Sequence, residues 1–221
     1  NSVVVFDYDK NGDYRFLIAT TDKKIHNYSK DGKLVQGWEP QPTKSIVLNP
    51  IEHFVIDNKD YICINDIQGN VYLLNRKGEL REKVSNQITT NHKENVFFQR
   101  GSSLATTKFI FLDSTEQIVE MPLDGISKSG YLDSTMYNFY HYTTDLENDK
   151  LPDFVVAFGN MLSVYGPDKS LVFKELYDFD IHQNIKSVGA NHQYTIVANQ
   201  KGNKIYLFNY QFKPVQGFPQ K

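Results

Sequence analysis

Carboxylate side chains are concentrated in two short stretches of the sequence, and an apolar run follows each of them. Residues 7–19 read DYDKNGDYRFLIA and residues 145–157 read DLENDKLPDFVVA, so the two stretches align without a gap. Side chains at alternate positions of a tight loop converge on one point, and Ca²⁺ takes about six to eight oxygen ligands in such a site. The residue types and their spacing therefore predict calcium-binding loops.

The oxygen donors occupy similar positions in the two loops. The first loop supplies Asp7, Asp9, Asn11 and Asp13. The second loop supplies Asp145, Glu147, Asp149 and Asp153. Three carboxylates in the first loop and four in the second repel one another unless a cation lies between them, so we expect Ca²⁺ in at least one loop. The alternative is an Asx-turn that needs no metal.

The two loops belong to a longer repeat. They lie 138 residues apart, which is three times 46, and the turn glycines Gly32 and Gly78 are 46 residues apart. The sequence VQGW at residues 35–38 returns as VQGF at residues 215–218. Self-similarity at a fixed period is typical of repeat architectures. We expect five units, at about residues 1–42, 43–88, 89–133, 134–178 and 179–221.

Each unit contains short apolar segments rich in β-branched and aromatic residues and separated by turn residues, which predicts four antiparallel strands. One meander of this size cannot bury both faces, whereas several packed around an axis can. We therefore predict an all-β fold, a single-domain β-propeller of five four-stranded antiparallel blades over residues 1–221. An arc of a larger ring, with about seven or eight blades, is the open alternative.

The acidic loops also resemble a known family. The pattern Asp-x-Asp-x-Asp/Asn-Gly-x-x-Asp before an apolar strand is similar to the calcium-loop propeller repeats of the FG-GAP and VCBS families. Two departures stand out, because Arg15 replaces the ninth-place acid of the first loop and Lys150 replaces the glycine of the second. The other three units resemble generic pyrroloquinoline-quinone-type propeller repeats. The resemblance implies a binding module with Ca²⁺-stiffened loops, in an extracytoplasmic location.

A weaker candidate ligand site comes from aromatic and imidazole side chains. His141 and His182 fall at equivalent places in two adjacent units, and Tyr140 lies in the densest aromatic stretch of the chain. Imidazoles side by side could bind a transition metal or a ligand, and exposed tyrosine could contact a protein or a glycan. Core packing and polar side chains at a wet channel are the alternatives.

Composition and charge limit the function. A formal net charge of −2 with a pI near 6.3 argues against a nucleic-acid partner. No apolar stretch approaches the roughly 20 residues of a membrane helix, so we expect no membrane span in this chain.

Common catalytic and phosphate-binding motifs are absent, and we expect a non-catalytic binding or scaffolding propeller with a protein or glycan partner. One alternative is a carbohydrate-active enzyme that uses Glu52 and Glu94 at the axial funnel. Another is a spacer domain that binds nothing.

Overall fold

A computed structural model describes residues 3–90, 96–132, 139–181, 185–188, 194–199 and 203–220. These residues form β-strands, turns and irregular segments, and none of them is helical. In these parts of the chain, no helical segment has the length and apolar character required for crossing a membrane. The prediction of an all-β fold is therefore confirmed.

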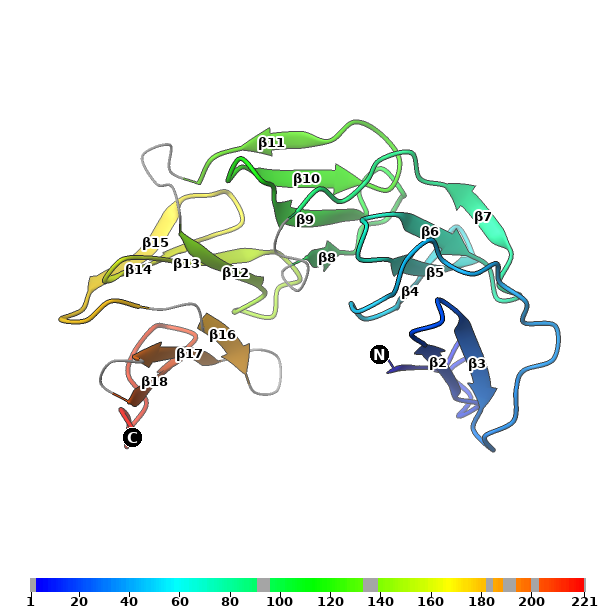
Figure 1. The fold of residues 1–221 in the computed structure, drawn as a ribbon, viewed down its shortest axis with the longest axis horizontal. Coiled ribbons are helices and arrows are strands. Elements are labelled where there is room, and N and C mark those ends of the chain that lie inside the picture. The colour runs from blue at the N-terminus through cyan, green and yellow to red at the C-terminus, as the bar shows by residue number, and fades with distance from the viewer. Residues whose placement is uncertain are drawn as a thin grey trace. The chain divides into compact units, whose positions relative to one another are not determined.

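The strands form five antiparallel sheets in sequence order (Figure 1). The first two sheets contain β1 (Val3–Phe6), β2 (Arg15–Ala19) and β3 (Ile25–Ser29), then β4 (Glu52–Ile56), β5 (Lys59–Asn65), β6 (Val71–Leu74) and β7 (Leu80–Lys83). The third contains β8 (Phe97–Gln99), β9 (Lys108–Leu112), β10 (Ile118–Pro122) and β11 (Lys128–Gly130). The fourth contains β12 (Tyr140–Thr144), β13 (Asp153–Phe158), β14 (Met161–Tyr165) and β15 (Leu171–Leu176). The fifth contains β16 (Ile185–Val188), β17 (Tyr194–Asn199) and β18 (Lys204–Asn209).

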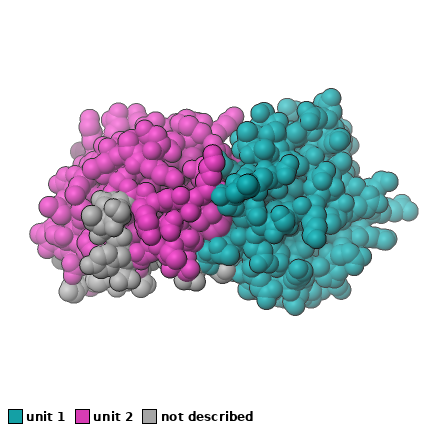
Figure 2. Space-filling model, turned by 90° about the horizontal axis from the view of Figure 1, so that it is seen from above, with its two compact units in different colours: residues 1–94, 100–109, 121–127 teal, residues 95–99, 110–120, 128–221 magenta. Residues whose placement is uncertain are grey.

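Figure 2 shows the two compact units of the chain, which are described separately. The first contains residues 1–94, 100–109 and 121–127, and the second contains residues 95–99, 110–120 and 128–221. In the first unit, Leu17 and Ile25 of the first sheet share a core with Ile62 and Ile64 of the second. The first two sheets therefore pack face to face, as blades do.

The second unit contains two such cores. Ile110 of the third sheet packs with Phe154 of the fourth, on one face of β13. Val155 packs with Phe208 of the fifth sheet, on the other face. Successive side chains of a strand point to alternate faces of the sheet, and both faces of β13 are covered. For this reason its sequence is a continuous apolar run.

The prediction of four strands in every blade is wrong for the first and fifth sheets, which have three among the described residues. The fourth position is reduced to isolated bridges, Tyr28 with Leu34 and Phe208 with Pro214. In each case a glycine with positive φ, Gly37 or Gly217, follows and turns the chain out of the extended conformation.

Candidate functional site

The first acidic loop connects β1 to β2 and is held by its own side chains. The Asp7 carboxylate accepts hydrogen bonds from the backbone N–H groups of Asn11 (3.1 Å) and Gly12 (3.0 Å). The Asn11 side-chain oxygen accepts one from the N–H of Asp13, at 2.9 Å. Lys10 and Gly12 both have positive φ, 53° and 82°.

The second acidic loop connects β12 to β13 and has the same bonds at the same positions. The Asp145 carboxylate accepts from the N–H groups of Asp149 (3.0 Å) and Lys150 (2.8 Å), and Asp149 accepts from Leu151 (2.8 Å). Asn148 and Lys150 have φ of 59° and 69°. Lys150 thus adopts the left-handed conformation of Gly12, and the alignment of the two loops is confirmed in backbone geometry.

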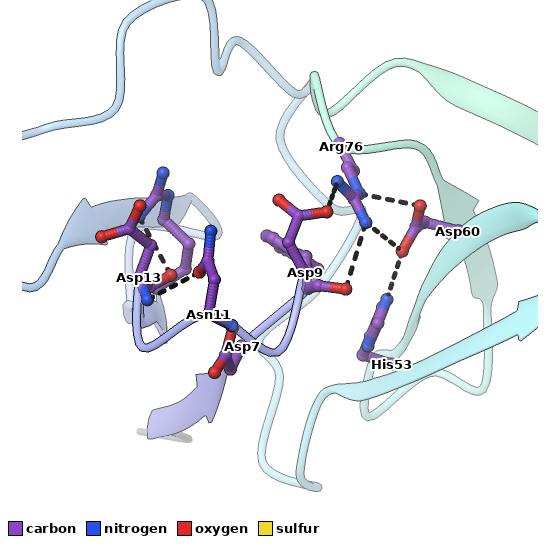
Figure 3. A network of polar contacts seen from close by, with 9 residues as sticks. Asp7, Asp9, Asn11, Asp13, His53, Asp60 and Arg76 are labelled. Carbon is purple, nitrogen blue, oxygen red and sulfur yellow. Dashed lines mark hydrogen bonds and ion pairs between the residues drawn. The ribbon is translucent and has the colours of Figure 1, made fainter.

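The charges around the first loop are balanced by the chain itself (Figure 3). Arg76 contacts Asp9 at 2.7 Å, and Lys30 contacts Asp13 at 2.8 Å. The hydrogen bond and charge of Lys30 hold the pKa of Asp13 below its usual value. The Arg76 guanidinium also lies over the Tyr8 ring, 4.9 Å from its centre.

Arg76 connects this loop to the second sheet. Its Nε lies 2.7 Å from Asp60, and Asp60 in turn contacts His53 Nε2 at 2.7 Å. Burial alone would raise the pKa of Asp60, but the bonds from His53 and Arg76 outweigh it and the pKa is lowered. Sequence reasoning did not identify these three residues, and the Arg76–Asp9 contact joins positions 67 residues apart.

The two cations of the first loop come from one repeat position. Lys30 follows Ser29, whose carbonyl accepts from the N–H of Gly32, and Arg76 follows Asn75, whose carbonyl accepts from Gly78. The equivalent turns of the fourth and fifth sheets have the same backbone hydrogen bond. There the N–H of Lys169 donates to the carbonyl of Gly166, and the N–H of Phe212 donates to the carbonyl of Asn209. The residues equivalent to Lys30 and Arg76 there are Pro167 and Tyr210. Neither of them carries a positive charge.

The second loop accordingly lacks these counter-ions. Within the described residues, no salt bridge involves Asp145, Glu147, Asp149 or Asp153. Asp153 is buried, with 7% of its surface exposed, and accepts a hydrogen bond from the N–H of Leu146 at 2.8 Å. Burial and the charges of the other three carboxylates raise the pKa of Asp153 to about 6.

A pocket of about 300 Å³ lies beside this loop. Its lining includes Glu147 and Asp153 together with Pro167, Asp168 and Tyr210. The oxygen donors are of the kind that Ca²⁺ prefers. In the described part of the chain, however, no three His, Cys, Asp or Glu side chains already converge as a metal site. The carboxylates would therefore have to turn inward to surround a cation.

The remaining predicted ligand-binding and catalytic residues are Tyr140, His141, His182, Glu52 and Glu94. Tyr140 and His141 lie on β12, where His141 is buried with 5% of its surface exposed and packs edge-on against Phe139. His182 and Glu94 lie outside the described residues. Glu52 forms an ion pair with Arg100 at 2.7 Å. The roles proposed for these residues stay predictions.

Comparison with known proteins gives structural similarity alone. No protein-family model matches the sequence, and no curated protein matches it. The structure is similar to BBS1N in a crystal structure with ARL6DN soaked with lead, with 10% identity and a TM-score of 0.53. That match covers 96% of this chain and 66% of the BBS1N chain.

Two further structures are similar at lower TM-scores. A mercury-soaked crystal of BBS1N with ARL6DN has 15% identity and a TM-score of 0.47, over 95% of this chain and 62% of that one. A Bacteroides caccae protein of unknown function has 13% identity and a TM-score of 0.45, and the match covers 94% of this chain and 78% of that protein's chain. At 10% identity, the match to the lead-soaked BBS1N crystal shows a shared fold alone. Because BBS1N is a β-propeller domain, the chain has a propeller-like fold of antiparallel sheets.

Proposed function

We propose that the chain is a non-catalytic propeller of five blades that binds or organises protein partners, with Ca²⁺ stiffening the loop of residues 145–153. The metal proposal depends on one observation, which is that neutral residues beside the second loop occupy the positions of two cations beside the first. Lys30 and Arg76 neutralise the first loop, whereas Pro167 and Tyr210 stand at the equivalent positions beside the second.

The electrostatics of the second loop support a bound cation. Asp145, Glu147, Asp149 and Asp153 are close enough for three of them to raise the pKa of the fourth. Above about pH 6 the Asp153 carboxyl loses its proton, and the added charge increases the repulsion within the loop unless a cation is present. Ca²⁺ is the natural candidate because it accepts several carboxylate oxygens in irregular geometry.

A protein partner is supported by the comparison with BBS1N, whose crystal structure contains ARL6DN. A non-catalytic role is supported by Glu52, since its carboxylate is held by Arg100. The resemblance to FG-GAP and VCBS repeats adds an extracytoplasmic location to the proposal. Calcium modules outside the cell bind with dissociation constants of about 0.1–1 mM, which suits a loop with few preformed contacts.

Calorimetric titration with Ca²⁺ tests the metal site. We expect one binding event in the wild type, lost in Asp145→Asn and retained in the matched variant Asp7→Asn. Each substitution keeps one of the two oxygens that accept backbone hydrogen bonds and removes the other, so the two loops lose the same acceptor. Equal loss in both variants, or no heat up to 10 mM Ca²⁺ (about 10–100 times the expected dissociation constant), would contradict the proposal.

A further inference from the structure

The outermost strand of the fourth sheet differs from the other sheet edges. β15 has six residues, whereas the outermost strands β7 and β11 have four and three. Three of its side chains, Leu171, Val172 and Leu176, are 52%, 65% and 65% exposed. A long apolar edge strand offers unpaired backbone groups to another chain, and proteins usually blunt such edges with charge or short length.

β7 is an internal reference for β15, because the two strands have the same irregularity. Each contains a β-bulge after its first residue, and Leu80 and Leu171 occupy the same place in the pairing. The bulged residue and the residue after it are Arg81 and Glu82 in β7, but Val172 and Phe173 in β15. Two charged positions of β7 are thus apolar in β15, whereas the next position is lysine in both strands, Lys83 and Lys174.

On its outer side, the backbone of β15 has hydrogen-bonding groups that pair with no described residue. The N–H of Tyr177 donates inward to the carbonyl of Asn160, at 2.9 Å. Since backbone groups of successive residues point to opposite edges, those of Lys174 and Leu176 point away from β14. Among the described residues, β14 is the sole strand paired with β15.

The charges of β15 identify the kind of strand that fits this edge. Lys174 and Glu175 are exposed on opposite faces, and neither forms a salt bridge with a described residue. Two-fold antiparallel pairing of β15 with a second copy would place lysine opposite lysine when centred on Lys174, or glutamate opposite glutamate when centred on Glu175, because the symmetry keeps each residue on its own face. Like charges opposite each other are destabilising. A different strand, with an acid opposite Lys174, avoids this repulsion.

We propose that the outer edge of β15 binds an extended segment of a partner protein by strand addition. The segment runs antiparallel to β15, with an acidic residue opposite Lys174. Aliphatic residues lie two positions before and two positions after this acid, on the same face of the strand. Main-chain hydrogen bonds to Lys174 and Leu176 supply affinity, and the side chains supply selectivity. This inference rests on the proposed protein-binding function and names the surface that performs it.

A synthetic peptide of sequence Thr-Val-Thr-Glu-Thr-Val-Thr with blocked ends tests the proposal. We expect it to slow amide hydrogen exchange at Lys174 and Leu176, and we expect lysine in place of its glutamate to weaken binding by about three- to tenfold. Val172→Arg, which copies β7, should weaken binding by about tenfold or more. The matched variant Arg81→Lys on β7 should leave it unchanged.

Three outcomes would overturn the proposal. They are no protection at millimolar peptide, protection of β7 instead of β15, and a dimer of the free chain that Val172→Arg dissociates. The last result would assign the edge to a second copy. Leu176→Lys is a second exposed variant if Val172→Arg folds poorly. Because the peptide assay needs no calcium, its failure is separate from failure of the metal titration.

Discussion

The loop before β2 and the loop before β13 have the same backbone and different surroundings. Both hold their first aspartate with two backbone N–H groups and pass through two left-handed residues. Lys30 and Arg76 contact the first loop, whereas no cation contacts the second among the described residues. One repeat position therefore distinguishes an acidic loop that the chain neutralises from one that has no salt bridge among the described residues.

In the described part of the chain, the first loop, unlike the second, is also connected to a neighbouring sheet by an ion pair. Arg76 lies between Asp9 and the partly buried Asp60, so it joins the loop to the second sheet (Figure 3). A metal ion would stiffen the loop alone. The tethered guanidinium stiffens the loop and fixes its place against a neighbouring strand pair.

The largest expected effect comes from breaking that link. Arg76→Gln removes the charge shared by Asp9 and Asp60 and should lower the free energy of unfolding by about 1–3 kcal/mol, since it leaves a partly buried carboxylate with His53 as its remaining side-chain partner. Chemical denaturation measures the loss. Lys77→Gln, in the same turn, is the control and should have little effect. Equal stability of Arg76→Gln and wild type would show that the link is unimportant.

The pKa of Asp153 predicts the next effect, which concerns the second loop. Its folded-state pKa of about 6 lies above the usual 3.8, so the folded state holds the proton more tightly than the unfolded state. Stability contributed by this group is present below about pH 4 and is lost as pH rises to about 6. Allowing for solvent screening at a loop, we expect a loss of about 1–2 kcal/mol in EDTA.

Asp153→Asn isolates this contribution. Carboxylates with lowered pKa values, such as Asp60, change stability with pH in the opposite sense. They are present in both the wild type and Asp153→Asn, so their contributions cancel in the difference between the two. The difference in unfolding free energy between Asp153→Asn and wild type should therefore grow between pH 4 and pH 6. A difference that is constant over this range would mean that Asp153 titrates normally.

Much of this organisation could be predicted from the sequence, because it depends on local patterns. The spacing of carboxylates identified both loops, and Gly32 and Gly78 marked equivalent turns. A Cβ on Gly78 would lie 2.9 Å from Pro40, so glycine is required there. The repeat was harder to follow in the later sheets, where Lys169 and Phe212 adopt the left-handed conformation at the same turn position.

Other features could not be read from the chain because they depend on tertiary neighbours. The pairing of Arg76 with Asp9 spans 67 residues and requires that the first two sheets pack together. The VQGW and VQGF segments look like strands, yet Trp38 turns inward and donates its ring N–H to the carbonyl of Ile25 at 2.8 Å. Burial of that one side chain replaces the expected fourth strand of the first sheet.

A smaller effect should follow from placing a cation beside the second loop. Pro167→Arg recreates the Lys30 position and should lower the Ca²⁺ affinity about three- to tenfold, because the guanidinium competes for the same carboxylates. Pro167→Ala is the matched control, since it removes the ring without adding charge. Calorimetry measures both. Unchanged affinity in Pro167→Arg would mean that this repeat position does not control the metal site.

The smallest expected effect concerns the left-handed position common to both loops. Gly12 has open space where a Cβ would lie, so Gly12→Lys should cost about 1 kcal/mol through backbone strain alone. The reverse change, Lys150→Gly, should raise the free energy of unfolding by about 0.5 kcal/mol. The gain is smaller because glycine loses more conformational entropy on folding. Opposite signs in the two loops, measured by denaturation in EDTA, would show that they share one backbone conformation in solution, and equal signs would show that they do not.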